Sequence, residues 1–555
     1  MTTMQAANIP GSDRSAARRP PAPRSVAQAI AEQLELWGAK RIYGVAGDAI
    51  FGLMDALAGQ KTIEFVSVKH ESAAAMMASA EAKLTGRIAV CMAQAGPGLT
   101  NLVTGLGDAY LDHAPVLAIT GQAPLNKIGT PYKQFINQQQ LMQAVSSYTQ
   151  MVAHPDAAIE SLTQAMTVSS IHRTVSHLSV PSDVFGMPTA APTQGPILVP
   201  APASDRNDLR RALLAMRSAK RPFLAAGSGA RPARELIGQL ADRWGSAVAY
   251  GYGAAGLVPD SHPLLVNGLG EGGNPFLPEL YREADVVLAV ETAAWPDELV
   301  SDRALVIRLT DRPDRAAPSV YDIGIVGHPA DVLRQWLEGL NGYEPNAQWI
   351  RQVEQCRRSF AEQNEKERNV VATPLHPASI VRAVERFISE DAIVALDEGD
   401  LTLWFLRGFR AKRHEIVLSD RWRTMGFGLP AAMAAKFCFP GRQVVCLTGD
   451  GGLGMVLADL ITAARYKLPI IVVVFNNGTL QMEHDKMRMK GLRPEGVAIS
   501  NPDFVQVAKA CGWNGVRIAT VGQLEDALLA ARDGDKPVLL DVQTAQVPHP
   551  DFIPT

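Results

Sequence analysis

Apolar and polar residues follow one another along the chain in patterns that predict helices and buried strands in turn. Helical spacing relates four apolar residues near the start of this pattern, namely Val26, Ile30, Leu34 and Trp37. Gly38 is placed to end that helix, and a short apolar strand is predicted at 41–45, with others at 88–92 and 116–120. These signals predict an α/β domain over residues 25–190, which a proline-rich connection at 187–203 brings to an end.

Two further regions repeat the α/β pattern. The second begins with an apolar run entering glycines at 222–229, has strands at 286–290 and 304–309, and predicts a central domain over 204–342. The third has a helix near Ile380 and predicts a domain over 375–547. Its strands are predicted at 392–396, 443–447, 470–475 and 538–542. We therefore predict an α/β protein with three parallel-sheet domains; whether the first and third are copies of one fold stays open.

Composition and charge narrow the kinds of partner. Hydrophobic residues make up 47% and charged residues 20% of the 555 positions, as in folded globular proteins. The 53 Lys and Arg against 56 Asp and Glu give a net charge of −3, which offers no field for nucleic acid or an anionic membrane. A small-molecule partner is expected, with no nucleic acid and no membrane.

The cysteines and the first residues bear on the compartment. Five scattered cysteines without a CxxC pair fit neither a disulfide framework nor a zinc site, so we expect a reducing, cytoplasmic location. No apolar run approaches the roughly 20 residues of a membrane-spanning helix. Residues 1–24 carry four arginines and four prolines without an apolar core. They are predicted to be a disordered tail, and a transit peptide is the alternative.

The most informative stretch is a buried strand that runs into Gly449-Asp450-Gly451-Gly452. A helix predicted at 453–466 and the strand at 470–475, which ends at Asn476-Asn477, make this a strand–helix–strand unit. The two strands are then parallel, so Asp450 and the asparagines emerge at one carboxyl edge. Such oxygen donors suit Mg²⁺, and glycine amides can approach phosphates closely. Taken alone, the Gly-Asp-Gly turn is also common at strand ends.

This unit, with residues 452–475 between the turn and the asparagines, resembles the thiamine-diphosphate motif of the acetolactate synthase, pyruvate oxidase and 2-oxo acid decarboxylase family. Similar short stretches are spread along nearly the whole chain, at 42–47, 70–74, 96–101, 118–122 and 424–430. The resemblance implies an N-terminal pyrimidine-binding domain, a central Rossmann-like domain and a C-terminal diphosphate-binding domain.

The resemblance also implies roles for individual residues. Asp450 and Asn477 would bind Mg²⁺ through their side chains and Thr479 through its carbonyl. The carbonyl of Arg423 would accept from the cofactor's amino group, and Met425 would bend the cofactor, although ordinary core packing is an alternative for Met425. Cofactor-binding backbone is implied at Gly399, Gly449, Gly451 and Gly452.

Glu71 matches the family's cofactor-activating glutamate, whose carboxyl group, bonded to the pyrimidine ring, promotes the tautomer that removes the reactive proton. In the family this residue reaches a cofactor held by a neighbouring subunit, so a homodimer or homotetramer with active sites between subunits is implied. Gln134 keeps its place in Lys133-Gln134-Phe135, where many relatives have Phe-Gln-Glu. Lys133 is either a carboxylate-binding residue or a solvated side chain.

Other departures leave the reaction open. Gln481 replaces a glycine of acetolactate synthases and pyruvate oxidases, and Glu483 looks like the pocket glutamate of pyruvate decarboxylases, with a solvated helix face as the alternative. His113 and His484 are weaker candidates. The glycine turns at 227–229 and 268–273 are incomplete as dinucleotide fingerprints. Thr310 stands where oxidase relatives have an acid, and the acetolactate-synthase arginine is absent from 291–295, so FAD binding stays open.

The function that the resemblance implies is addition of the cofactor's ylid to a short 2-oxo acid, pyruvate by default, with loss of CO₂ and transfer of the enamine. An acetolactate-synthase-like transferase or lyase is expected. The alternatives are an FAD-containing pyruvate oxidase or dehydrogenase and a non-oxidative decarboxylase that uses Glu483 as its acid. A rival from another class is a cofactor-binding protein that has lost catalysis.

Overall fold

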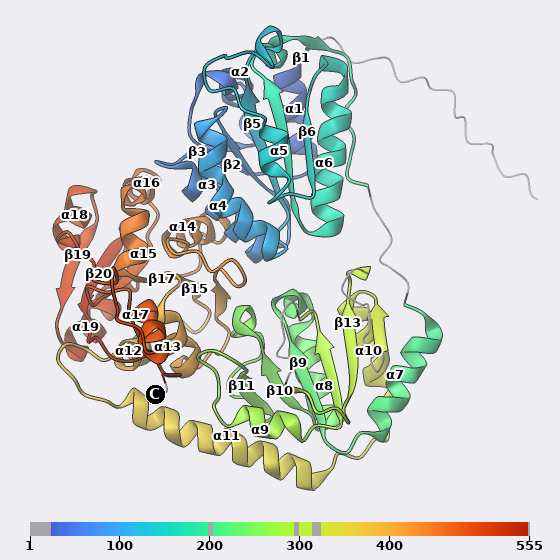
Figure 1. Cartoon of the computed structure of the whole chain (residues 1–555), viewed down its shortest axis with the longest axis vertical. Coiled ribbons are helices and arrows are strands. Elements are labelled where there is room, and N and C mark those ends of the chain that lie inside the picture. Colours follow the sequence, from blue (N-terminus) through green and yellow to red (C-terminus); the bar gives the residue numbers. More distant parts are fainter. Residues whose placement is uncertain (1–23, 198–203, 293–298, 314–322, 553–555) are drawn as a thin grey trace, which may run out of the picture.

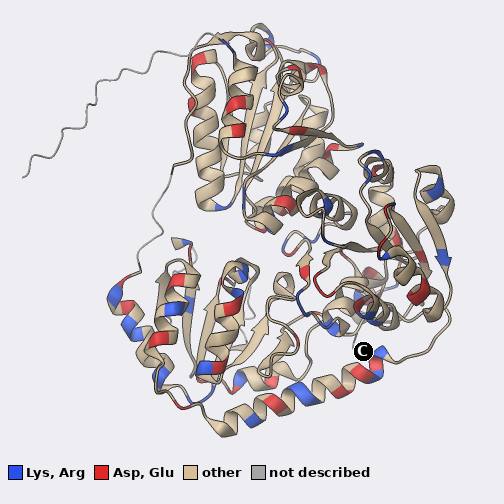
Figure 2. Ribbon diagram, turned by 180° about the vertical axis from the view of Figure 1, so that it is seen from behind, with Lys and Arg blue, Asp and Glu red and all other residues tan. Residues whose placement is uncertain are grey.

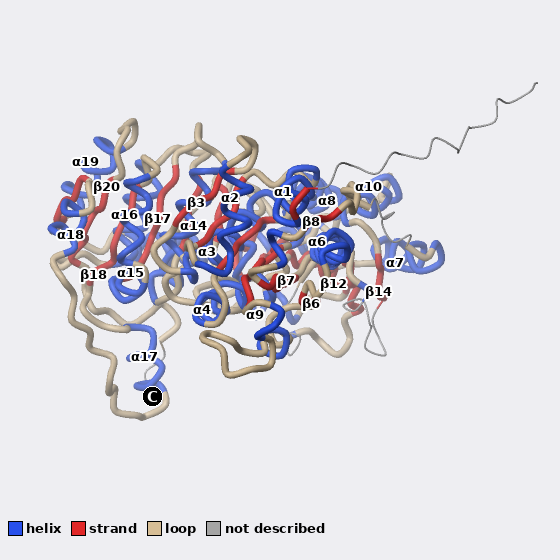
Figure 3. Tube along the Cα trace, turned by 90° about the horizontal axis from the view of Figure 1, so that it is seen from above, coloured by secondary structure: helices blue, strands red, loops and turns tan. Residues whose placement is uncertain are grey.

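The computed structural model describes residues 24–197, 204–292, 299–313 and 323–552. The tail predicted at 1–24 therefore lies outside the described residues except for Arg24. The chain forms three α/β lobes, each built on a six-stranded parallel sheet (Figure 1). Seen from above, helices lie between the sheets as well as at the edges of the molecule, as α3 (Glu71–Thr85) and α14 (Gly428–Cys438) show (Figure 3). The α/β class with three parallel-sheet domains is confirmed.

The N-terminal sheet has the strand order β3-β2-β4-β5-β7-β6. Its strands are β2 (Arg41–Gly44), β3 (Glu64–Ser67), β4 (Ala89–Ala93), β5 (Val116–Gln122), β6 (Tyr148–Met151) and β7 (Val175–Pro181). Its helices are α1 (Val26–Leu36), α2 (Phe51–Ala58), α3 (Glu71–Thr85), α4 (Pro97–Leu111), α5 (Gln138–Met142) and α6 (Ala158–His172). A two-stranded antiparallel pair, β1 (Arg24–Ser25) with β8 (Pro188–Thr189), joins the two ends of this domain.

The central sheet has the order β11-β10-β9-β12-β13-β14, the 3-2-1-4-5-6 order of a Rossmann fold. Its strands are β9 (Pro222–Ala226), β10 (Ala247–Tyr250), β11 (Leu265–Gly268), β12 (Val286–Val290), β13 (Leu305–Thr310) and β14 (Ile323–Val326). Its helices are α7 (Arg206–Ser218), α8 (Arg234–Trp244), α9 (Leu277–Arg282) and α10 (Pro329–Gly339).

The C-terminal sheet has the order β16-β15-β17-β18-β20-β19. Its strands are β15 (Ile393–Leu396), β16 (Glu415–Val417), β17 (Val444–Gly449), β18 (Ile471–Asn476), β19 (Asn514–Ile518) and β20 (Val538–Gln543). Its helices are α12 (Pro377–Phe387), α13 (Asp400–Gly408), α14 (Gly428–Cys438), α15 (Asp450–Met455), α16 (Leu460–Arg465), α17 (Gln481–Met489), α18 (Phe504–Ala510) and α19 (Val521–Ala531). Numbered within each domain, the N- and C-terminal sheets share the order 2-1-3-4-6-5.

The long helix α11 (Ala347–Arg368) connects the central and C-terminal domains and runs beneath both of them (Figure 1). It carries Lys, Arg, Asp and Glu along its length (Figure 2) and buries an apolar stripe of Trp349, Val353, Cys356 and Phe360. The prediction of a single helix at 453–466 is wrong in detail, because the helix is interrupted between α15 and α16. The break lets the buried Asp459 carboxylate accept from the backbone N–H of Lys69 at 2.9 Å, which ties the C-terminal domain to the first.

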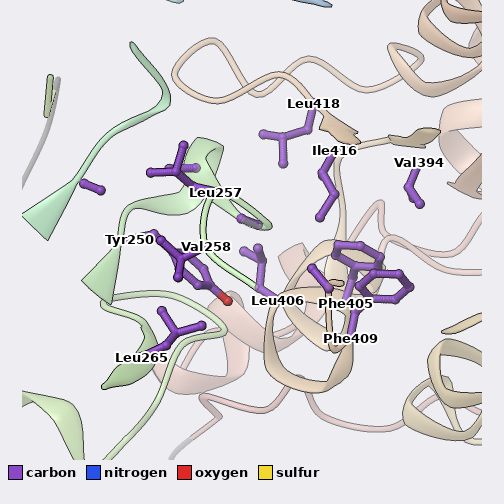
Figure 4. Packing of buried hydrophobic residues seen from close by; sticks show 14 of the residues in the cluster. Tyr250, Leu257, Val258, Leu265, Val394, Phe405, Leu406, Phe409, Ile416 and Leu418 are labelled. Atoms are coloured by element: carbon purple, nitrogen blue, oxygen red, sulfur yellow. The ribbon is translucent and has the colours of Figure 1, made fainter. Parts of the chain in front are cut away.

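Shared apolar cores hold the domains together. One cluster contains buried residues of both the N- and C-terminal domains, in which α3 packs on α14. Another joins the central and C-terminal domains, where Leu257 and Val258 lie near Leu406, Phe409 and Leu418 (Figure 4). All five cysteines are unpaired. Within the described residues, none of the helices is long and apolar enough to cross a membrane.

Candidate active site

A pocket of about 200 Å³ lies at the carboxyl edge of the C-terminal sheet. It gathers the loops that follow β15, β17 and β18 with the start of α17. The sequence-predicted residues that line it are Gly399, Arg423, Met425, Gly449, Asp450, Gly451, Gly452, Asn477, Thr479 and Glu483. One chain therefore brings together ten residues from five segments of the sequence, including the loop after β16 that carries Arg423 and Met425.

Asp450, the first residue of α15, is 3% exposed and lies between the ends of two adjacent strands. Its Oδ2 accepts from the backbone N–H of Gly478 and from Nδ2 of Asn501, each at 2.7 Å. Burial raises the pKa of the Asp450 carboxyl, and these hydrogen bonds oppose that rise. Asn501 was missed by the sequence reasoning because only folding of the loop after α17 returns it to this edge.

The other predicted cation ligands follow β18. The Asn477 side-chain oxygen accepts from the backbone N–H of Thr479 at 3.1 Å, and the Asn477 carbonyl accepts from Gln546 at 2.7 Å. Gly478 between them has φ +69°. Over the described residues, no three His, Cys, Asp or Glu side chains are grouped to hold a metal ion. A cation here would instead use one carboxylate with amide and carbonyl oxygens, a donor set that fits Mg²⁺ and its retained waters.

Close packing leaves little room for a side chain at two glycines of the turn. A Cβ on Gly452 would lie 2.6 Å from Oδ2 of Asp397, and one on Gly451 would lie 3.1 Å from the Met425 methyl. Gly399 has φ +151°, a conformation that L side chains rarely adopt. The backbone is thus bare where an anionic group would approach it.

Carboxyl groups dominate the floor of the pocket. Burial, followed by the nearby Asp485 and Asp450 carboxylates, raises the pKa of Asp400 to about 7. Burial likewise raises the pKa of Glu398 to about 7, although Tyr252 donates a hydrogen bond to it at 2.9 Å. Such a surrounding stabilises a cation and disfavours an unaccompanied anion.

Arg423 stands at the pocket mouth with φ +52°, a strained value for a side-chain-bearing residue. Its guanidinium lies 4.2 Å from the Tyr252 ring centroid and pairs with Glu271, and both of these residues belong to the central domain. Glu483 also lies at the mouth, with 59% of its side chain exposed and an oxygen 3.7 Å from Lys486 Nζ. His484 instead lies 3.0 Å from Asp485, whose other oxygen accepts from His549 N in the C-terminal segment.

Glu71 and Gln134 do not line this pocket within the same chain. Glu71 begins α3 in the N-terminal domain and accepts from Asn101 at 3.0 Å. Gln134 has φ +61° and accepts from Gln94 at 2.9 Å. Beside it, Lys133 pairs with Asp48 at 2.9 Å, with both side chains more than half exposed.

A second cavity of about 150 Å³ lies where the three domains meet, and His113 and Glu291 are among its lining residues. The Glu291 backbone has φ +50° and blocks a Cβ on Gly227, while its carboxylate lies against Gly229. That carboxylate accepts from Asp311 N at 2.6 Å and from Thr310 Oγ1 at 3.2 Å. The glycine turn considered for FAD is therefore closed by an acidic side chain of the protein itself.

Comparison with known proteins identifies the class. Three family profiles match the chain in order: the thiamine pyrophosphate enzyme N-terminal TPP binding domain over residues 24–147, the central domain over 209–336, and the C-terminal TPP binding domain over 397–542. Thiamine pyrophosphate is another name for thiamine diphosphate. The chain belongs to the thiamine pyrophosphate enzyme family.

Individual relatives match this chain over most of their length. YdaP of Bacillus subtilis (strain 168), whose name records thiamine pyrophosphate but no reaction, is 31% identical over 95% of this chain and 92% of its own. Pyruvate oxidase of Lactiplantibacillus plantarum is 30% identical over 94% and 89%. Acetolactate synthase isozyme 1 large subunit of Escherichia coli K12 is 29% identical over 88% of each chain. The predicted acetolactate synthase and pyruvate oxidase family is confirmed.

Proposed function

We propose that this protein is a Mg²⁺- and thiamine-diphosphate-dependent enzyme that decarboxylates a short 2-oxo acid, pyruvate by default, and passes the remaining fragment on without oxidation. The observation that carries the proposal is the pocket beside Asp450. It combines bare glycine backbone, oxygen donors for one cation and an apolar wedge in one place.

Different residues of this pocket would bind different parts of the cofactor. Asp450 and Asn477 would hold Mg²⁺ through side-chain oxygens and Thr479 through its carbonyl, while the glycine backbone at 399 and 449–452 would face the diphosphate. Met425 would pack between the cofactor's rings, and the Arg423 carbonyl would accept from its amino group. When bound, thiamine diphosphate supplies a carbon nucleophile and an electron sink for decarboxylation.

Glu71 would come from a second copy of the chain. Its carboxyl group would hold a proton at the pyrimidine nitrogen, and Gln134 of the same domain would orient the substrate. Since neither residue lines the pocket of its own chain, the proposal requires a homodimer at least, and a homotetramer also satisfies it.

The closed glycine turn of the central domain favours the non-oxidative outcome. A dinucleotide laid on Gly227 and Gly229 would bring its phosphates against the Glu291 carboxylate, and like charges repel. Glu483 lies at the pocket mouth. If the product is an aldehyde, Glu483 would protonate the fragment that remains after CO₂ has left. If the fragment is transferred to a second carbonyl, Glu483 would have to stay away from it.

The test uses the purified full chain with thiamine diphosphate and Mg²⁺, offered pyruvate and several larger 2-oxo acids. We expect CO₂ release together with an aldehyde or a carboligation product, and a colourless protein. A flavin absorption spectrum would contradict the non-oxidative proposal and favour the pyruvate oxidase alternative. If Glu71→Ala leaves CO₂ release unchanged, the assigned chemistry is overturned. If the chain binds the cofactor but releases no CO₂, the result supports the alternative of a cofactor-binding protein that has lost catalysis.

A further inference from the structure

The loop of residues 418–426 leads from β16 to the N-cap of α14 and presents Arg423 and then Met425 to the pocket. Its first half is held by the N-terminal domain of the same chain. Leu418 is buried among apolar residues shared by the central and C-terminal domains (Figure 4), so the loop starts from a fixed point.

A charged cluster at α3 and the C-terminal end of α4 lies against this loop. Lys83 Nζ lies 2.8 Å from Asp108 Oδ2 and 2.7 Å from Asp112 Oδ2, and it donates to the Leu418 carbonyl at 2.9 Å. The side chains of Lys83, Asp108 and Asp112 are only 14%, 0% and 3% exposed. Removing charges from water at this depth is costly unless they are paired, and Lys83 is paired with both carboxylates.

Asp112 completes the attachment to the loop backbone. Its Oδ2 accepts from the N–H of Asp420 and its Oδ1 from the N–H of Arg421, each at 2.8 Å. Two side chains of the N-terminal domain therefore fix one carbonyl and two amides of the loop. This contact acts on backbone geometry directly, since no loop side chain intervenes.

Packing along α4 supports the same arrangement. The Trp422 ring lies over Gly107, where an added Cβ would come within 2.8 Å of it. The Lys83 ammonium lies 4.5 Å from the Phe427 ring centroid, just past the loop. The loop therefore contacts α4 at two places, the charged Asp112 at the end of the helix and the surface of Gly107.

The far end of the loop is fixed by the C-terminal domain itself. The buried Asp397 carboxylate accepts from Gly426 N at 2.8 Å, and Ser419 Oγ accepts from Thr424 N at 3.1 Å. Arg423, with its strained φ, lies between these two anchors and the Asp420 and Arg421 amides that Asp112 holds. A conformation of this kind persists only where its surroundings enforce it.

We propose that Lys83, Asp108 and Asp112 are positioning residues for the cofactor site: from the N-terminal domain of the same chain they hold the Arg423 carbonyl and Met425 where the cofactor's aminopyrimidine end binds. The inference rests on the proposed function. It assigns the N-terminal domain two separate tasks, since Glu71 serves the neighbouring subunit while α3 and α4 shape the pocket of their own chain.

The experiment measures thiamine diphosphate affinity by calorimetry at saturating Mg²⁺, with hydrogen exchange of residues 418–427 as a second readout. Asp112→Asn keeps the side-chain shape but removes the charge and one acceptor. We expect its affinity to fall about ten- to a hundredfold and exchange in the loop to speed up. Lys83→Arg keeps the charge and donors, so it should retain most of the affinity.

Controls separate positioning from stability. Glu385 is matched to Asp112, because it pairs with the buried Arg368 at 2.8 Å and accepts from Arg410 N at 3.0 Å, away from the pocket. Glu385→Gln should lower the free energy of unfolding and leave the affinity unchanged. If Asp112→Asn does not fold, Gly107→Ala is the second test. Alanine is compatible with helix α4, and its Cβ would displace the Trp422 ring of the loop. Folded Asp112→Asn or Gly107→Ala variants that bind with parental affinity would overturn the proposal, whereas a parent that does not bind overturns the proposed function instead.

Discussion

The N-terminal and C-terminal domains share the strand order 2-1-3-4-6-5, yet the carboxyl edges of their sheets carry different groups. After the third strand in sequence the C-terminal domain turns through Gly449 into Asp450, whereas the N-terminal domain passes Gln94 and Gly96 into α4 without a carboxylate. After the second strand the C-terminal domain presents Met425, and the N-terminal domain presents Glu71.

This difference shows how one topology supplies two halves of a site. The C-terminal edge offers oxygen donors and bare backbone for an anion with its cation, and the N-terminal edge offers a carboxyl group for proton exchange. The packing of α3 against α14 holds the two domains of one chain in a fixed relation. Under the proposed function, the N-terminal edge of another copy would therefore complete the pocket of each chain.

The largest effect is expected from a substitution in the N-terminal half of the proposed site. Glu71→Gln should lower turnover by roughly 10²–10⁴-fold, because the carboxyl group that exchanges the proton is lost, while thiamine diphosphate affinity stays near the parent's. Steady-state kinetics and calorimetry measure the two quantities. Mixing Glu71→Gln subunits with Asp450→Ala subunits should restore activity, since a mixed dimer contains one intact pair of edges. A mixture that stays inactive would contradict a site shared between subunits.

A smaller effect is expected for the residue behind the carboxylate. Asn501→Ala removes the 2.7 Å hydrogen bond to Asp450 Oδ2. Outer-shell partners of metal ligands contribute about 10- to 100-fold in affinity, so Mg²⁺ should bind that much more weakly. Titration of Mg²⁺ at fixed thiamine diphosphate measures this change. Asn369→Ala, on the exposed end of α11, is the control, and equal affinity in both variants would refute the assignment.

Two glycines of α15 sharpen the claim of a bare backbone. A methyl group on Gly452 meets Asp397 at 2.6 Å, whereas Gly454 has nothing within 4 Å. Gly452→Ala should cost about 1–3 kcal/mol of unfolding free energy through overpacking and weaken cofactor binding. Gly454→Ala should gain about 0.5–1 kcal/mol because alanine favours the helix. Urea denaturation compares them, and equal midpoints would count against the packing described.

A stability effect of similar size concerns the N-terminal domain in acid. His177 is fully buried on β7 between Thr120 and Thr149, and burial lowers its pKa to about 3 from 6.5. Between these values the unfolded chain binds a proton that the folded chain does not, so stability present above pH 6.5 is lost as the pH falls. The loss at pH 5 should be about 2 kcal/mol. His177→Gln should flatten the unfolding free energy between pH 7 and 5, and an unchanged slope would contradict this.

Local patterns explain what could be predicted from the sequence. The strand at 286–290 was found because it is a continuous apolar run, and Asp450 and Asn477 were placed together because a strand–helix–strand unit leaves little freedom. Helix α11 was missed, although Trp349, Val353, Cys356 and Phe360 have helical spacing, because charged residues dominate its other faces. Asn501 and the Lys83–Asp112 contact have no local signal, since they depend on how distant segments meet.

The most direct test of the central claim is calorimetric titration of thiamine diphosphate into the full chain, with and without Mg²⁺, for the parent and for Asp450→Ala. The account predicts binding by the parent only when Mg²⁺ is present, and a loss of more than about 100-fold in the variant, since a ligand should matter more than an outer-shell partner. Equal binding by both proteins, or parental binding that does not depend on Mg²⁺, would contradict it.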